Sequence, residues 1–372
     1  MGGGGSQPDA GHEGRLPGDR VARMKVSLQL IPEQPVEELL AAAGAADELG
    51  YYACYSADEI YHKDAWLLLA TAAGRTEQIR FGPCVAPVYL RDPTHISQLA
   101  ATLDELSGGR AEVVLGIGNL ATLEQYGVEW RGTGAIGRLR EAHRVIRSLL
   151  DEGALDFAGD FFRYKGVTTA ARPVQEHVPV KLGAMGGPKS MRLAGEVADG
   201  LHTACAYSAA ALRYAVHQFD LGAASAGRDA DRLDIGDSLL GAIAPDPNVA
   251  RRAGRILAAF YLPSMPAALL ERHGIDPGEV APVNEAFAAG DVARALDLTP
   301  DAIADRIVVA GAPADWIEWL SGSYAPLGLN HALLSFADPF TLQAWAGIEV
   351  EGLPDLVAQV RLFGEEVLPQ LP

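Results

Sequence analysis

Two adjacent carboxylates, Asp58 and Glu59, are the residues of this sequence best suited to proton transfer. They follow residues 51–56, an apolar run that predicts a buried strand, so they stand at its carboxyl end. Neighbouring carboxylates shift each other's pKa, and an acid that keeps its proton near neutral pH can act as a general acid. The alternative is that Asp58 caps the next helix while Glu59 is solvated. Both interpretations stay open, and the pair forms the candidate catalytic site.

Glycine clusters after two other apolar runs are candidate ligand-binding loops. Glycine has no side chain, so a flat ligand can lie against the backbone, and a neighbouring amide can hydrogen-bond its carbonyl or hydroxyl groups. The second cluster also opens a helix, whose free N–H groups favour an anion. Packing turns are the alternative for both clusters. The candidate cofactor-binding residues are Gly116, Gly118 and Asn119 in the first cluster, and Gly183, Ala184, Met185, Gly186 and Gly187 in the second.

The elements that must position these residues alternate along the chain. Strands are expected at 25–30, 51–56, 79–85, 111–116, 178–182, 200–203, 233–243 and 332–336. Helices are expected at 36–49, 65–74, 93–106, 136–150, 190–198, 209–224 and 340–363. This α/β alternation, without a dinucleotide-binding glycine fingerprint on the first turn, predicts a (β/α)₈ TIM barrel. The chemistry of such barrels is at the carboxyl ends of the strands, where the candidate residues fall.

Two segments interrupt the alternation. Residues 157–164 place Gly-Asp between aromatic residues and predict a hairpin, and residues 245–306 predict a helical insertion before the last strand. His273, in this insertion, is expected to be a surface or packing residue. Residues 1–23 begin with a Gly-rich run and are interpreted as a flexible tail or linker outside the fold. Residues 24–372 are therefore expected to form a single barrel domain.

Composition excludes several classes of function. The chain has 372 residues and a formal net charge of −18, which argues against binding to nucleic acid or to an anionic membrane surface. No apolar run reaches the roughly 18 residues of a membrane-spanning helix. The three cysteines, Cys54, Cys84 and Cys205, give neither a disulfide framework nor metal-ligand spacing. We therefore expect no metal site and a cytoplasmic location.

The order of these motifs resembles the luciferase-like flavin and deazaflavin oxidoreductases. Within them it is most similar to the methylenetetrahydromethanopterin reductases, which use coenzyme F420. The resemblance extends over about residues 24–363. It implies a homodimeric barrel enzyme in which reduced F420 gives a hydride to a small organic substrate. The residues that carry it are Leu115-Gly116-Ile117-Gly118, Leu182-Gly183-Ala184-Met185-Gly186-Gly187-Pro188, Leu270-Glu271-Arg272-His273-Gly274-Ile275 and Ala310-Gly311-Ala312-Pro313, with the segment 93–110.

The resemblance also implies roles for individual residues. Cys84 and Val85 match a bulge of the family whose cis peptide supports the cofactor ring, and burial would keep the Cys84 thiol unreactive. Asp58 matches the Asp of an Asp-His pair, and Glu59 stands where the His would be. The glycine cluster 183–187 matches the site of the cofactor phosphate, with Met185 packed beside the ring.

Two other functions remain open. An FMN-dependent luciferase-like monooxygenase would bind reduced FMN and activate oxygen. A barrel without catalytic activity would only bind a cofactor or a partner, and the changed residues Glu59 and Asn119 keep this alternative open. Loops and insertions define the substrate pocket, so the sequence does not name the substrate.

Overall fold

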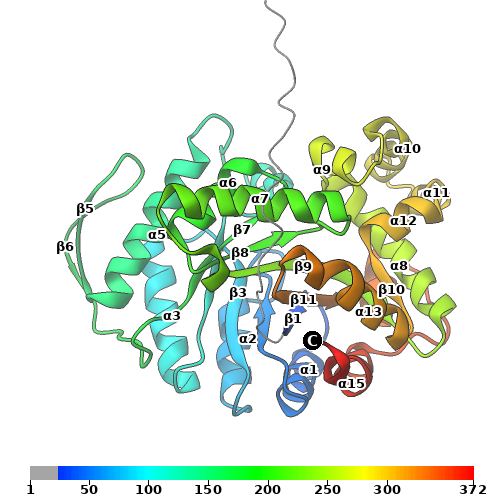
Figure 1. The fold of residues 1–372 in the computed structure, drawn as a ribbon, viewed down its shortest axis with the longest axis horizontal. Helices are drawn as coiled ribbons and strands as arrows, with labels where there is room; N and C mark the ends of the chain where they lie inside the picture. The colour runs from blue at the N-terminus through cyan, green and yellow to red at the C-terminus, as the bar shows by residue number, and fades with distance from the viewer. Residues whose placement is uncertain (1–23) are drawn as a thin grey trace, which may run out of the picture.

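Residues 24–372 are described by the computed structural model, and the expected tail, residues 1–23, lies outside them. In this range a sheet of nine strands closes on itself, because β8 also pairs with β9. β10 (Val309–Gly311) pairs only with the end of β9, so eight parallel strands form the barrel (Figure 1). The predicted TIM barrel is confirmed. In ring order the strands are β9 (Asp234–Ile243), β11 (His331–Phe336), β1 (Lys25–Leu30), β2 (Ala53–Ser56), β3 (Arg80–Pro87), β4 (Val113–Gly116), β7 (Val180–Ala184) and β8 (Gly200–Ala204).

Helices cover the outside of the barrel (Figure 1). Their starts follow from the sequence: Asp64 and Asp92 accept hydrogen bonds from first-turn N–H groups of α2 and α3, and Ser208 does the same for α7. Their apolar faces pack on the strands, which places the core between the two layers. These helices are α1 (Val36–Glu48), α2 (Ala65–Ala73), α3 (Pro93–Ser107), α5 (Ala135–Asp151), α6 (Pro188–Val197), α7 (Ala209–Ser225) and α8 (Pro247–Tyr261).

Both predicted interruptions are present. β5 (Ala154–Ala158) and β6 (Arg163–Thr168) form an antiparallel hairpin. The helical insertion lies to one side of the barrel, beyond α8 (Figure 1). It consists of α9 (Ala267–Arg272), α10 (Pro277–Ala288), α11 (Val292–Asp297) and α12 (Asp301–Ile307), and α13 (Pro313–Trp319) follows β10.

The single helix predicted at 340–363 is wrong, because two helices occupy this range. α14 (Pro339–Ala346) ends where Gly347 adopts a left-handed φ of 65°. The chain then turns, and Asp355 caps the start of α15 (Leu356–Glu366). Three short elements, α4 (Leu120–Gln125), β10 and α13, were not predicted, because six, three and seven residues carry too little periodicity.

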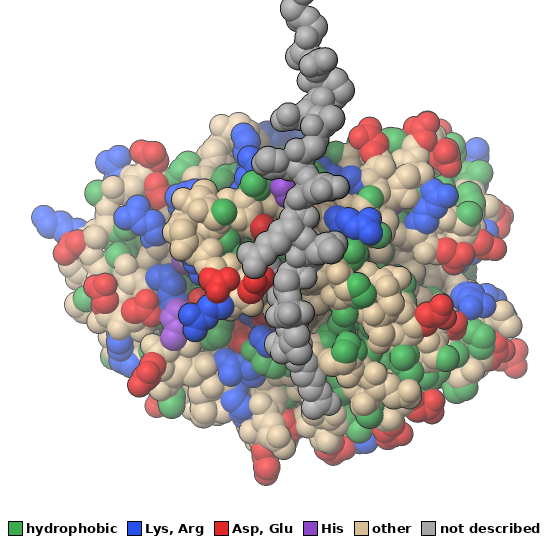
Figure 2. Space-filling view, viewed as in Figure 1, with side chains coloured by type: hydrophobic (Ala, Val, Ile, Leu, Met, Phe, Trp, Pro, Cys, Tyr) green, Lys and Arg blue, Asp and Glu red, His purple; other side chains and the backbone are tan. Residues whose placement is uncertain are grey.

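The surface carries charges of both signs. On the face drawn in Figure 2, acidic and basic side chains are interspersed rather than gathered into one basic stripe. The sequence contains 48 acidic and 30 basic residues, so negative charges are in excess. No helix within residues 24–372 combines the length and the apolar character needed to span a lipid bilayer.

Candidate active site

Asp58 is fixed by a clamp at the carboxyl end of β2. Nε and Nη2 of Arg91 each donate a 2.7 Å hydrogen bond to one of its oxygens, and the Trp66 indole donates a third of 3.1 Å. The side chain is buried. The interpretation of Asp58 as a helix cap is wrong, since Asp64 caps α2. Arg91 also binds Asp64 at 2.9 Å, so one guanidinium joins the loop after β3 to both acids.

Glu59, the next residue, is half-buried. Its Oε2 accepts a hydrogen bond of 3.4 Å from the Thr122 hydroxyl, and the Tyr61 hydroxyl is a second partner. Burial raises the pKa of Glu59 above its usual value, and the negative charge of Asp58 raises it further. The two predicted carboxylates therefore have different surroundings. Asp58 is paired with the cationic side chain of Arg91, and Glu59 is hydrogen-bonded by neutral hydroxyls.

A cavity of about 300 Å³ lies beside these two acids, near the lower end of the roughly 300–1,000 Å³ range of small-molecule sites. His62 also lines it. Burial lowers the pKa of His62 to about 4, which favours the neutral ring at pH 7. The lining residues come from the ends of β2 and β3: Asp58, Glu59, Ile60, His62, Asp64, Pro87, Leu90 and Arg91.

The peptide between Cys84 and Val85 is cis, as predicted. The pairing of β3 with β4 shifts register between Cys84 and Ala86. The side chain of Val85 fills the space beside two of the candidate glycines, because a Cβ on Gly116 or on Gly183 would collide with it. These glycines therefore make room for Val85. Burial raises the pKa of the Cys84 thiol to about 12, which keeps it protonated.

The loop after β4 leads into the unpredicted helix α4. Gly118 has a φ of 102°, a conformation that side chains disfavour. Asn119 Oδ1 accepts from the Thr122 N–H at 3.5 Å, which helps to start α4 and places Thr122 against Glu59. Thr122 and the clamp residue Arg91 were not among the predicted site residues. Both lie just beyond a strand end, which is the signal that could have found them.

The loop after β7 opens α6 as predicted. Gly186 adopts a φ of 73°, and Met185 is exposed. The residue before the helix is Gly187, which offers no side-chain cap to the first-turn N–H groups. The first turn of α6 is therefore left without a side-chain cap. The carbonyl oxygen of Gly186 accepts a hydrogen bond from Arg272 of α9.

A second cluster of ionisable residues fills the opposite end of the barrel and was not predicted. Lys181 lies 2.8 Å from Glu112 and 2.5 Å from Asp234, and all three are buried. Burial alone would raise the pKa of both acids, but the charge of Lys181 holds each of them below its usual value. Arg80 also binds Glu112, at 2.6 Å. The barrel floor is therefore a buried ion cluster.

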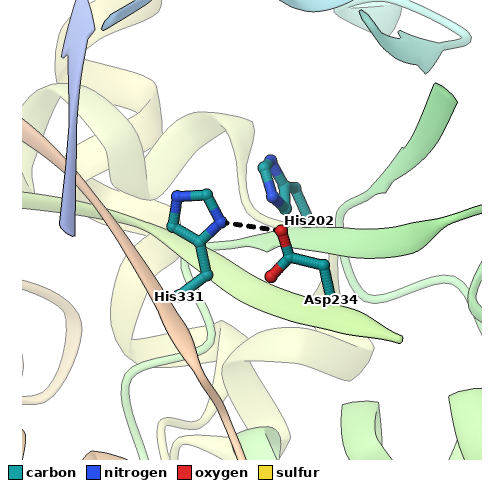
Figure 3. Close-up of side chains that lie close together, drawn as sticks. All are labelled: His202, Asp234 and His331. Atoms are coloured by element: carbon teal, nitrogen blue, oxygen red, sulfur yellow. Dashed lines mark hydrogen bonds and ion pairs between the residues drawn. The ribbon is translucent and has the colours of Figure 1, made fainter. Parts of the chain in front are cut away.

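His202, Asp234 and His331 approach one another in this floor closely enough to suggest a metal centre (Figure 3). His331 Nδ1 lies 3.1 Å from Asp234, whose oxygen already binds Lys181. The floor carries three cationic side chains, from Lys25, Arg80 and Lys181, against two anions, so it has one excess positive charge. A divalent cation would add to this excess. The arrangement favours an ion cluster over a metal centre.

A closed (β/α)₈ barrel with an acid, a backbone bulge and a glycine loop at the carboxyl ends of its strands has the architecture of a TIM-barrel enzyme. The family model described as luciferase-like monooxygenase matches residues 15–331. This is more than half of the chain, and the chain belongs to the luciferase-like monooxygenase family.

Several individual relatives are reductases. The 5,10-methylenetetrahydromethanopterin reductase of Archaeoglobus fulgidus is 28% identical over 352 residues, 94% of this chain and 100% of the relative. That of Methanolobus tindarius is 30% identical over 78% of this chain and 88% of its own. The structure of the coenzyme F420-dependent tetrahydromethanopterin reductase from Methanopyrus kandleri matches with a TM-score of 0.85 at 26% identity, covering 94% of this chain and 100% of that one. The predicted family is confirmed, and the protein is an oxidoreductase.

Proposed function

We propose that this protein uses F420 to transfer a hydride between the deazaflavin and a small organic substrate, with Glu59 as the proton donor. The observation that carries the proposal is the position of Glu59. A half-buried acid with a raised pKa borders a cavity in a fold that closely matches an F420-dependent reductase. When bound, F420 supplies two-electron hydride chemistry, and the protein supplies binding, orientation and the proton.

The residues at the strand ends fit such a cofactor. Cys84 and Val85 would support the ring from the barrel side, because Val85 is held firmly beside Gly116 and Gly183. The uncapped start of α6 offers N–H groups to a phosphate. Asn119, Gly118 and the exposed Met185 would line the remaining edge of this cofactor site, together with Ala184, Gly186 and Gly187.

Each carboxylate of the pair has a separate task in this proposal. Arg91 and Trp66 engage both oxygens of Asp58, which suits it to hold the loop in place. Burial raises the pKa of Glu59 and so favours its protonated form, and the Thr122 hydroxyl donates a hydrogen bond to one of its oxygens. Glu59 would then give this proton to the substrate as the substrate accepts the hydride. It would regain a proton from solvent through the cavity.

We also propose a symmetric homodimer in which the helices after β2 and β3 pair. Leu67 on α2 leaves 73% of its surface exposed, which an apolar partner surface would cover. Light scattering should give twice the mass of the chain. A monomer at working concentration would contradict this part of the proposal.

Anaerobic titration with F420 and with FMN, each in its reduced form, tests the cofactor. We expect F420 to bind and FMN to bind much more weakly. Retained FMN without affinity for F420 would instead support the monooxygenase. Binding of F420 without turnover of any offered carbonyl, imine or alcohol substrate would support a barrel that only binds its ligand.

A further inference from the structure

Helix α9 of the insertion touches the glycine loop after β7 through Arg272. Nη1 of Arg272 donates a 3.1 Å hydrogen bond to the carbonyl oxygen of Gly186. The Cζ atom of Arg272 lies 3.7 Å from the ring centre of Tyr214 on α7, and this cation–π contact restrains the guanidinium. A Cβ on Gly186 would meet Leu269 and Arg272 at about 3.5 Å, so α9 packs directly on this glycine.

The same end of α9 is also fastened to the loop after β8. The Ser208 hydroxyl donates a 3.0 Å hydrogen bond to the carbonyl of Arg272. His273 Nε2 lies 2.8 Å from the carbonyl oxygen of Cys205, and since a carbonyl only accepts, Nε2 carries the proton. His273 is buried, which confirms its expected packing role. Arg272 is thus held between two loops at the mouth of the barrel.

This geometry has an electrostatic consequence for the start of α6. An anion at that helix end would meet free N–H groups, and Gly186 stands one residue before Gly187, from which the helix starts. Arg272 binds the Gly186 carbonyl oxygen and brings a full positive charge to the loop. It therefore both holds the carbonyl in place and favours an anion beside it.

We propose that Arg272 is a positioning residue that makes the loop 183–187 selective for the phosphate-bearing form of the cofactor. The inference rests on the proposed function, and it gives the helical insertion a task in binding. Arg272 acts through the loop and not on the reacting atoms. Its loss should therefore weaken binding and leave the rate at saturating cofactor largely unchanged.

The test compares two ligands, F420 and its deazaflavin chromophore without the phosphate, by fluorescence titration. Arg272→Ala should raise the Kd for F420 by about tenfold and leave the Kd for the phosphate-free chromophore within about twofold. Arg272→Lys, which keeps the charge, should fall between wild type and Arg272→Ala. Arg306→Ala is the matched control, because Arg306 also donates to a glycine carbonyl of the insertion, that of Gly274, at 2.7 Å. This control should bind both ligands as wild type does.

Tyr214→Leu gives a second variant should Arg272→Ala fail to fold. It removes the stacking surface, keeps the charge, and should weaken F420 binding alone, by less than Arg272→Ala. Equal weakening of both ligands, or unchanged affinity for F420, would overturn the role of Arg272 while leaving the proposed function intact. Wild-type protein that binds neither ligand would overturn the proposed function and this inference together.

Discussion

Arg91 donates two hydrogen bonds of equal length to the carboxylate of Asp58, 2.7 Å from Nε and 2.7 Å from Nη2. Such a bidentate pair fixes the orientation of both groups as well as their separation. Because Asp58 cannot turn, the residue that follows it leaves the end of β2 in a defined direction. The clamp thereby sets where Glu59 meets Thr122 and the cavity.

Replacing Glu59 with Gln tests the proton donor. The variant keeps the shape of the side chain and loses the transferable proton. General acid catalysis typically contributes about 10²–10⁴-fold, so turnover should fall by a factor in that range while F420 affinity stays the same. Stopped-flow oxidation of the reduced deazaflavin measures the effect. Glu105→Gln, an exposed acid on α3, should change nothing.

The pH profile of the wild-type rate gives an independent check of the same residue. Burial raises the pKa of Glu59, so the active, protonated form persists to higher pH than for an ordinary glutamate. The rate should therefore fall as pH rises through this raised pKa. The falling limb should be absent from the residual rate of Glu59→Gln, and its persistence there would assign the titration to another group.

Gly183→Ala should destabilise the protein, because the new Cβ would collide with Val85. Overpacking of this kind typically costs about 1–3 kcal/mol. Val85→Ala in the same chain should recover part of the loss, and chemical denaturation of the single and double variants measures this coupling. Gly44→Ala in α1 is the control, because its Cβ would meet open space and should stabilise slightly. Additive effects of Gly183→Ala and Val85→Ala would contradict the contact.

Glu112→Gln should break the ion cluster of the barrel floor. Removing one partner of a buried ion pair costs roughly 3–5 kcal/mol, and Lys181 would lose the acid 2.8 Å away. The pKa of Glu112 is held below its usual value by Lys181 and Arg80, so its contribution is fully present at neutral pH. This stabilising contribution is lost progressively as the pH falls below about 4, the usual pKa of a glutamate.

Denaturation at pH 7 and at progressively lower pH measures this dependence. The gap in stability between wild type and Glu112→Gln should narrow as the solution is acidified. Glu48→Gln, which removes an exposed ion pair with Arg361, should cost less than about 1 kcal/mol. An equally small cost for Glu112→Gln would show that the floor tolerates an uncompensated charge.

His202→Phe distinguishes the ion cluster from a metal centre. Neither ring nitrogen of the buried His202 has a hydrogen-bond partner among the described residues, and its ring packs edge-on against Tyr55 and His331. A phenyl ring should therefore be neutral or stabilising within about 1 kcal/mol. His331→Phe should cost more, since His331 bonds both Ser27 and Asp234. Loss of stability together with loss of a bound cation in His202→Phe would support the metal centre instead.

The sequence predicted the barrel because each strand and helix has a local signature. The 25–30 strand and the helix start at Pro93 illustrate this, since apolar runs and turn residues mark them directly. The helix expected at 340–363 ends early, because Gly347 adopts a left-handed conformation there, although the apolar periodicity continues beyond it.

The candidate site was harder to predict, because its contacts join distant segments. Arg91 reaches Asp58 across 33 positions, and Thr122 reaches Glu59 across 63. Lys181 meets Asp234 across 53. From sequence alone, a lysine or glutamate beside a strand is expected to be solvated, because its partner in the fold is not known. The spacing of residues gives no information on which of them the ring of strands will bring together.

Lys181 also bears on how the barrel folds. It stands on β7 and forms ion pairs with Glu112, just before β4, and with Asp234, at the start of β9. An open arc of strands that lacked β9 would leave these groups partly unmatched in an apolar interior, or would have to stay hydrated. A ring that lacks β4, β7 or β9 would therefore leave part of the ion cluster without its partner. Closure of the barrel should be cooperative, because each of these three strands supplies an ion-pair partner to another.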